Sequence, residues 1–292
     1  MAKYAMLWTT SRGYMPGTNA SLNAMELFGF KDVEVIVLTG GEFLPEEYKA
    51  AWPDVKFVDF MKFIVPPTGD YGWGYLYGDI VYAVENLRDY DAILFWGGDV
   101  CVAANFMEYF EICHKLDAMV LGTNEHGSHY LDSQTGMSQQ WPYAHTWTVP
   151  YADVPFFVSK GTFPVLDLMI EYTKRPDNKL DRMDGMNYAV RDVKAKVVEV
   201  PGELWVCNVP YRRMLEMGRN REIFVSQSSS KMKAFHRRYW EADTCRIYLP
   251  GGTAESSPIS RNNKLLFNKY YHFLNTQCRV KWTESVELWD GQ

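Results

Sequence analysis

The sequence lacks any long uncharged apolar segment. No run among its 292 residues approaches the eighteen or so apolar residues that a membrane-spanning helix needs. The opening residues, MAKYAMLWTT, also lack the extended apolar region of a secretory signal. These absences argue against membrane-spanning and secreted proteins, and they predict a soluble, cytoplasmic one.

Cysteine is scarce and follows no recognisable pattern. The five cysteines are odd in number and widely spread, with no CxxC pair and no disulfide-framework spacing. Internal repeats and low-complexity tracts are absent as well, which argues against solenoid and disordered classes. Reduced, mostly buried thiols in a globular protein are therefore expected.

The net negative charge of the protein is small, and the basic residues are concentrated in one region of the chain. The formal net charge is −6, yet residues 212–281 contain fourteen Lys or Arg and only five Asp or Glu. Such a basic region is typical of a protein with an anionic partner, whether a pyrophosphate, a polymer or nucleic acid. A solvated basic face would have the same composition, so both interpretations stay open.

Short apolar runs alternate with helical patterns along the first half of the chain. Tyr4 to Thr10, Val33 to Leu38 and Val55 to Val58 are expected to be buried strands. Helices between successive strands favour a mainly parallel sheet, because parallel neighbours need crossover connections. The predicted class is α/β, with a Rossmann-like domain over residues 1–240 and a C-terminal extension over 241–292 that packs on it.

Capping and turn residues set the expected limits of the first helix and of two loops. The helix is predicted from Thr18 to Phe28, with Thr18 or Asn19 as its N-terminal cap and Gly29 as its stop. Small and polar residues favour loops at residues 226–230 and 250–260.

A buried strand running into Gly97-Gly98-Asp99 provides the main candidate for a functional site. Open α/β sheets bind ligands in the crevice at the carboxyl ends of their strands. A carboxylate at that place suits a metal or phosphate site. The alternative is that Asp99 caps a following helix, since Asp is a common N-cap residue.

Three segments resemble, in order, the landmarks of the glycogenin-like family of retaining GT-A glycosyltransferases. They are the pattern Thr9-Thr10-x-x-x-Tyr14-x-x-Gly17-x-x-Ala20-Ser21-Leu22, the run from Tyr90 to Gly97-Gly98-Asp99, and Ala234-Phe235-His236. This resemblance spans about the first 240 residues. It implies a GT-A fold and an EC 2.4 enzyme that takes a sugar from a nucleotide-diphosphate sugar, with a UDP-sugar favoured.

The resemblance also implies roles for particular residues. Tyr14 would lie against the nucleotide base, and Asp99 and His236 would hold Mn²⁺ or Mg²⁺. The other residues implied at the nucleotide are Thr9, Gly17, Gly97, Gly98, Lys233, Arg237 and Arg238. Asp184 resembles the acidic residue beneath the donor sugar, with Asn187 nearby, and these two are the catalytic candidates.

The chemistry of the donor accounts for these residue types. A nucleotide-sugar has a diphosphate leaving group, and a hard cation neutralises the charge that develops on it. Carboxylate and imidazole ligands together suit Mn²⁺. Basic side chains beside the imidazole would bind the phosphate oxygens.

Two departures from the family pattern keep other functions open. Gly97 replaces the first Asp of the usual Asp-x-Asp, and Val81 stands where the family tends to have Lys or Arg. A catalytically silent sugar-binding or nucleic-acid-binding module would tolerate both changes. A nucleotidyltransferase is a further alternative, although the first loop, SRGYMPG, is a poor match to its glycine-rich loop.

The acceptor is not identified by the sequence. A carbohydrate, a protein, a lipid-linked precursor or a hydroxymethylated base in DNA would each supply a suitable hydroxyl. Nucleic acid is included because of the basic C-terminal region, since Lys and Arg neutralise backbone phosphates.

Overall fold

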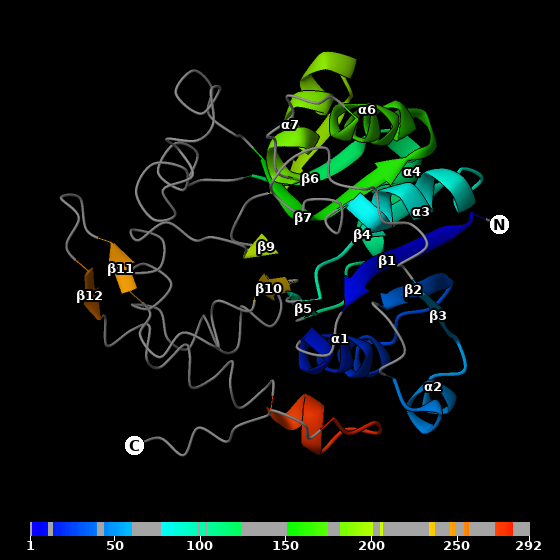
Figure 1. Ribbon diagram of the computed structural model, residues 1–292, viewed down its shortest axis with the longest axis vertical. Coiled ribbons are helices and arrows are strands. Elements are labelled where there is room, and N and C mark those ends of the chain that lie inside the picture. Colours follow the sequence, from blue (N-terminus) through cyan, green and yellow to red (C-terminus); the bar gives the residue numbers. More distant parts are fainter. Residues whose placement is uncertain are drawn as a thin grey trace. The chain divides into compact units, whose positions relative to one another are not determined.

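The computed structural model describes residues 2–10, 14–39, 44–59, 77–98, 100–102, 104–123, 151–174, 182–200, 205–206, 234–236, 246–248, 254–256 and 272–282 (Figure 1). Contacts between residues divide the chain into two compact units. The sheet unit comprises Met1–Arg12, Lys31–Gly97 and Phe106–Val200. The α1 unit comprises Gly13–Phe30, Gly98–Asn105 and Pro201–Gln292. The domain boundary that the sequence suggests after residue 240 stays a prediction.

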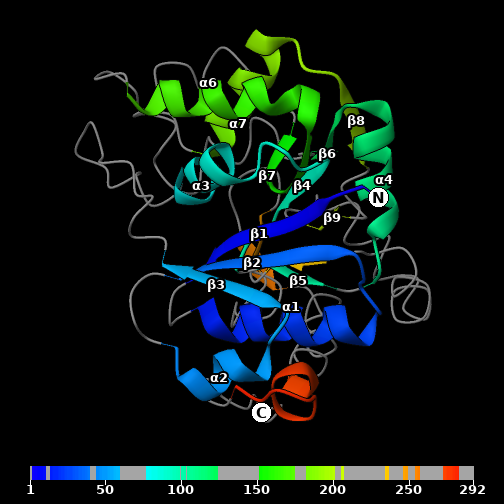
Figure 2. The ribbon, with the colours of Figure 1, turned by 90° about the vertical axis from the view of Figure 1, so that its right-hand side faces the viewer.

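A seven-stranded sheet forms the centre of the sheet unit. Its strands are β1 (Tyr4–Thr10), β2 (Val33–Thr39), β3 (Val55–Asp59), β4 (Ala92–Phe95), β6 (Met119–Thr123), β7 (Tyr151–Ser159) and β8 (Val197–Val200). They lie in the order β3-β2-β1-β4-β7-β6-β8, as the ribbon in Figure 2 shows for β1 to β4. Within this sheet β7 is antiparallel to both neighbours, while the other described pairings are parallel. The mainly parallel α/β sheet predicted from the sequence is confirmed.

Helices cover both faces of this sheet. The described helices of the unit are α2 (Glu46–Ala51), α3 (Gly78–Asn86), α4 (Met107–Leu116), the short 3-10 helix η5 (Lys160–Thr162), α6 (Phe163–Thr173) and α7 (Arg182–Val193). Side chains alternate along each strand, so Ala5 and Leu7 point to the face covered by α3, α6 and α7. On the opposite face, Phe157 of β7 contacts Phe110 of α4 edge to face, with ring centroids 4.9 Å apart. Apolar side chains therefore pack between the sheet and helices on both of its faces.

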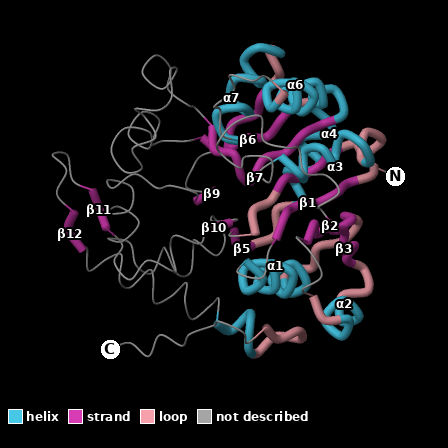
Figure 3. Tube along the Cα trace, viewed as in Figure 1, coloured by secondary structure: helices cyan, strands magenta, loops and turns pink. Residues whose placement is uncertain are grey.

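The α1 unit contains the first helix and several short strands. Helix α1 (Met15–Leu27) is buried from Met15 to Met25. Strands β5 (Val100–Val102), β10 (Ala234–His236) and β9 (Trp205–Val206) form a three-stranded sheet in that order, and β11 (Arg246–Tyr248) pairs with β12 (Ala254–Ser256). Figure 3 distinguishes the helices from these strands. Residues 272–282 include a helical turn at 272–276.

The start of α1 differs from the sequence-based prediction. The helix begins at Met15, with Pro16 in its first turn, so Thr18 and Asn19 lie inside the helix and do not cap it. Proline is favoured at this position because its missing N–H has no helical partner there and its φ is already helical. The predicted stop is confirmed, since Gly29 has φ +66° directly after the helix.

Strand β12 corrects a second prediction. Residues 250–260 were expected to form a loop, but Ala254–Ser256 pair with Arg246–Tyr248 in an antiparallel ladder. The Gly-Gly and Ser-Ser pairs of residues 250–260 favour a loop in isolation, and the hydrogen bonds of the partner strand override that preference. The expected loop at 226–230 lies outside the described residues.

Helix α4 and strand β5 have no counterpart among the sequence-based predictions. β5 is only three residues long, too short for a periodic pattern.

No helix in the part of the chain that the structure describes is long and apolar enough to cross a bilayer.

Candidate functional site

In the sheet unit, the strand order reverses between β1 and β4. From β1 the chain moves to β2 and β3 on one side, and it returns to β4 on the other. The last paired residues of β1 and β4 are Leu7 and Phe95. Beyond them, the Trp96 N–H donates a hydrogen bond of 2.8 Å to the Leu7 carbonyl oxygen. Thr9 and Gly97 each lie two residues beyond that last pair. Such a switch point is where open α/β sheets bind ligands.

In the α1 unit, β10, which contains His236, pairs with β5, the strand that directly follows Asp99 in the sequence. The two strands are antiparallel, with Val100 opposite His236 and Val102 opposite Ala234. Val100 is the residue that directly follows Asp99 in the sequence. Asp99 and the side chain of His236 lie outside the described residues. The backbone register nevertheless pairs the position of His236 with the neighbour of Asp99, although 136 positions separate Val100 from His236 (236 − 100).

Two other candidates lie at the beginning of α1. Tyr14 occupies the N-cap position without a side-chain capping bond, and 43% of it is exposed. Gly17 is buried in the first turn. An exposed aromatic ring at the start of a helix is of the type that stacks on planar ligands.

Further along α1, a buried hydroxyl contacts β5. Ser21 is fully buried, and its Oγ donates a hydrogen bond of 2.8 Å to the carbonyl oxygen of Val100. Helix α1 and strand β5 therefore share a direct bond one residue after Asp99 in the sequence.

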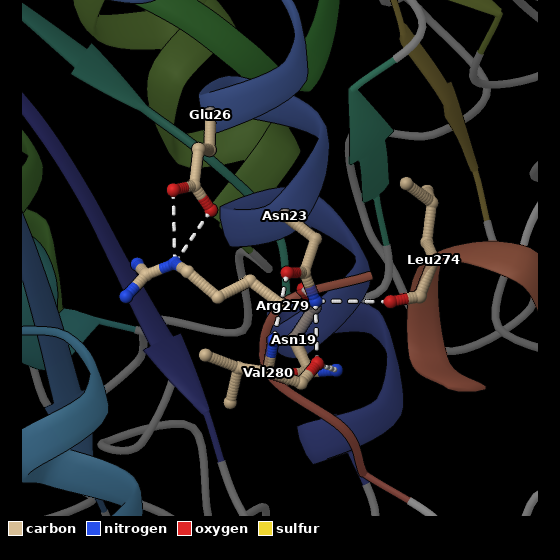
Figure 4. A network of polar contacts seen from close by, with 6 residues as sticks. All are labelled: Asn19, Asn23, Glu26, Leu274, Arg279 and Val280. Atoms are coloured by element: carbon tan, nitrogen blue, oxygen red, sulfur yellow. Dashed lines mark hydrogen bonds and ion pairs between the residues drawn. The ribbon is translucent and has the colours of Figure 1, made fainter. Parts of the chain in front are cut away.

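Two other polar side chains of α1, Asn19 and Asn23, hold residues 272–282. Asn23 Nδ2 donates to the carbonyls of Leu274 and Val280 over 2.9 and 2.8 Å. Asn19 Nδ2 donates to Asn275 Oδ1 and to the Val280 carbonyl over 3.0 and 3.1 Å. Figure 4 shows this network together with the ion pair between Glu26 and Arg279.

The catalytic candidates belong to α7 in the sheet unit. Asn187 is 1% exposed, and its side-chain amide forms two hydrogen bonds with the backbone of Tyr151, at 3.0 and 2.8 Å. The side chain of Asp184 lies outside the described residues. Next to it, a side chain added at Gly185 would come within 2.5 Å of the Tyr77 hydroxyl, so this turn of α7 packs closely on Tyr77.

A buried ion pair joins the first turns of α3 and α7. Asp79 is fully buried and Arg182 is 8% exposed, and their side chains approach to 2.7 Å. Asp79 also accepts a hydrogen bond from the backbone N–H of Ile80. Burying either charge alone would be costly, so each side chain compensates for the burial of the other.

Tyr151, whose backbone contacts Asn187, has a hydroxyl group with a raised pKa. Burial, together with a hydrogen bond of 3.0 Å to Glu199, raises the pKa of the Tyr151 hydroxyl to about 12. Tyr151 therefore stays protonated at neutral pH and acts as a donor to Glu199. It is unsuited to serve as a general base there.

Several expected ligands cannot be placed. Lys233, Arg237 and Arg238 lie outside the described residues, as does Asp99. Across the described ranges, no three side chains of the His, Cys, Asp or Glu type gather closely enough to hold a metal ion. Cys113 and Cys278, the cysteines whose side chains are described, are free thiols, and burial raises the pKa of each.

Comparison with known proteins places the fold. No protein-family model and no curated protein matches the sequence. Solved structures do match. The apo structure of WbbM, described as a bifunctional glycosyltransferase, is 13% identical over 80% of this chain and 45% of its own, with a TM-score of 0.56. The galactosyltransferase LgtC, solved with donor and acceptor sugar analogues, is 11% identical over 93% of this chain and 96% of its own, with a TM-score of 0.52.

The fold is that of the GT-A glycosyltransferases. Apo mouse xyloside xylosyltransferase 1 adds to these matches, at 12% identity over 81% of this chain and 98% of its own, with a TM-score of 0.50. The chain spans less than half the length of the WbbM chain. The GT-A fold expected from the sequence is confirmed, while membership of the glycogenin-like family stays a prediction.

Sequence reasoning overlooked the role of Ser21 and the pair of Asp79 with Arg182. Ser21 belongs to the pattern that resembles the family, but it received no function. The sequence nevertheless contains a sign of this contact. Four polar residues, Thr18, Asn19, Ser21 and Asn23, lie in a helix without a clear polar face. Polar residues in a buried helix require hydrogen-bond partners elsewhere in the fold.

Proposed function

We propose that this protein is a glycosyltransferase that moves a sugar from a nucleotide-diphosphate sugar to a hydroxyl group, with a UDP-sugar as donor. The register of β5 with β10 is the observation that supports this proposal most directly. It pairs His236 with the residue after Asp99, in a chain whose fold resembles that of LgtC solved with sugar analogues. The EC 2.4 class and retention of anomeric configuration belong to the same proposal.

The proposed metal is Mn²⁺ or Mg²⁺, and the donor set fits it. Asp99, directly before β5 in the sequence, would supply an oxygen, and His236 of β10 would supply a nitrogen. Two protein ligands are sufficient when phosphate oxygens and water complete the coordination, as is usual for cations bound with nucleotides. When bound, the cation would stabilise the negative charge of the diphosphate leaving group.

In the α1 unit, the proposed donor contacts lie around this pair. The ring of Tyr14 would stack on the base, and Gly17 and Gly98 would leave room for the nucleotide. Lys233, Arg237 and Arg238 adjoin β10 in the sequence, so their charges would bind the diphosphate.

In the sheet unit, the proposed contacts are Thr9 and Gly97 at the switch point and Asp184 on α7. Asp184 would act beneath the donor sugar. We assign Asn187 a supporting role, because its amide is engaged by the Tyr151 backbone and the side chain is almost fully buried. Asn187 would thereby fix the beginning of β7.

The acceptor belongs to the proposal only as a class. A carbohydrate or protein hydroxyl and a hydroxymethylated DNA base are the candidates. DNA binding would weaken steeply as salt increases, because phosphate contacts release counterions. A flat salt response of acceptor binding would favour a small acceptor.

Donor binding by isothermal titration calorimetry is the first test. UDP, UDP-glucose, UDP-galactose and GDP-mannose are titrated with and without Mn²⁺ into the native protein and the variants Asp99→Ala and His236→Ala. We expect one of these donors to bind in a Mn²⁺-dependent manner, and each variant to weaken that binding at least about tenfold. Asp54→Ala, an exposed carboxylate at the start of β3, is the matched control and should bind like the native protein.

Turnover separates the enzyme from its alternatives. Release of the free nucleotide from the bound donor would support a transferase, since hydrolysis by water commonly accompanies transfer. Donor binding without turnover in the presence of any acceptor would favour a catalytically silent module. Binding of a nucleoside triphosphate with pyrophosphate release would favour a nucleotidyltransferase. Absence of all nucleotide binding would refute the proposal.

A further inference from the structure

The hydroxyl of Ser21 anchors the strand that adjoins the proposed metal site. β5 is three residues long and lies at the edge of its sheet, with β10 as its only strand neighbour among the described residues. Such a strand has few ladder bonds to fix its position. The bond from Ser21 Oγ to the Val100 carbonyl supplies a further fixed point.

The bond is fully enclosed, which makes it informative. Ser21 is 0% exposed and Val100 is 2% exposed, so water does not readily replace either partner. A buried carbonyl that loses its donor keeps the cost of desolvation without compensation. The hydroxyl therefore contributes to fixing the position of β5 relative to α1.

The same helix carries the proposed base-stacking residue. Tyr14 lies seven residues before Ser21, and seven helical residues span about 10 Å along the axis. This is similar to the distance between the base and the diphosphate of a nucleotide. Helix α1 thus connects the candidate contacts for the two ends of the donor.

The rest of α1 explains why this connection is rigid. Asn19 and Asn23 attach the helix to residues 272–282 through four hydrogen bonds of 2.8 to 3.1 Å. Residues 272–282 thereby hold one side of the helix, and the hydrogen bond from Ser21 to Val100 links the helix to β5. Buried polar bonds of this kind impose direction, which apolar contacts do not.

We infer that Ser21 is a positioning residue for the donor and metal site, acting through the Val100 carbonyl to hold β5, the strand that follows Asp99 in the sequence, in its pairing with β10 and at a set distance from Tyr14. This inference rests on the proposed function. It assigns Ser21 no contact with the donor, so its effect should appear in binding of the nucleotide together with the metal.

The test compares Ser21→Ala with Asn23→Ala in the same helix. Ala is well tolerated in helices, so both variants are expected to fold. For each variant, the unfolding temperature and the Kd of the Mn²⁺–UDP pair are measured, the latter by calorimetry. Ser21→Ala should raise the Kd about tenfold, which corresponds to the loss of one buried hydrogen bond. Asn23→Ala should lower the unfolding temperature at least as much and change the Kd less than about twofold.

Ser21→Cys provides the conservative comparison. A thiol of similar size is a weaker hydrogen-bond donor, so its Kd should fall between those of the native protein and Ser21→Ala. Equal changes in Kd for Ser21→Ala and Asn23→Ala at equal loss of unfolding temperature would overturn the inference, since only general destabilisation would remain. If the native protein binds no nucleotide, the proposed function itself fails, which is a different result.

Discussion

Different kinds of contact stabilise each of the two units internally. The sheet unit is sealed by aromatic and aliphatic packing, as in the stacked rings of Phe95 and Phe156, whose centroids are 4.6 Å apart. The described part of the α1 unit relies on buried polar side chains of α1, such as Asn19 and Asn23, which bind backbone carbonyls. Apolar burial stabilises in proportion to area and has no direction, whereas hydrogen bonds fix geometry. The comparison indicates that the sheet unit provides stability and that α1 provides exact placement.

The largest expected effect comes from a substitution that disrupts the packing of the sheet unit. Phe157→Ala should lower the free energy of unfolding by about 3–5 kcal/mol, because it leaves a cavity against Phe106 and Phe110. Chemical denaturation monitored by tryptophan fluorescence measures this loss.

Phe273→Ala in the α1 unit serves as the matched change. Phe273 is 38% exposed, so less apolar area is lost and its neighbours can be rehydrated. A loss as large as that of Phe157→Ala would show that the two units do not differ in the way described.

A smaller effect is expected from removing a polar anchor of α1. Asn23→Ala should cost about 1–3 kcal/mol, since the Leu274 and Val280 carbonyls lose a buried donor. Hydrogen exchange followed by mass spectrometry should show faster exchange in residues 272–282 than in β1.

Asn23→Asp sharpens the same comparison. It keeps the shape of the side chain but places a carboxylate against two carbonyl oxygens, so we expect a greater loss than with alanine. Unchanged exchange in residues 272–282 for both variants would show that Asn23 does not hold this segment.

The smallest effect concerns the ion pair at the edge of the same network. Arg279 Nε lies 2.9 Å from Glu26, and both side chains are about half exposed, at 49% and 47%. Glu26→Gln should therefore reduce stability by about 0.2–1 kcal/mol at low ionic strength and by less at 1 M salt, where exposed charges are screened. A double-mutant cycle with Arg279→Gln measures the coupling, and a coupling independent of salt would contradict this account.

Much of the sheet unit was predictable because its signals are local. The limits of β1 agree with the predicted strand, and β2 ends one residue beyond its prediction, since continuous apolar runs mark buried parallel strands. The stop of α1 at Gly29 was predictable for a similar reason, because a positive φ favours glycine. Helix α4 was missed, and β12 was mistaken for a loop, where tertiary pairing outweighs local preference.

The candidate site was only partly predictable. The order of Tyr14, Asp99 and His236 along the chain indicates a donor site, but their spacing matches no common ligand motif. The roles of Ser21 and of Asp79 with Arg182 depend on partners far away in the chain, which no local pattern reveals.

By itself, the sequence determined the α/β class and the parallel strands, because periodicity and turn chemistry act over a few residues, whereas the expected donor-site residues came from its resemblance to a glycosyltransferase family and stay a prediction. Only the tertiary structure decided which residues meet. The pairing of His236 with Val100 and the bond from Ser21 to the Val100 carbonyl join positions 136 and 79 residues apart, from 236 − 100 and 100 − 21. Such contacts follow from how the elements pack and pair, since a buried polar group must find its partner wherever the fold brings one near.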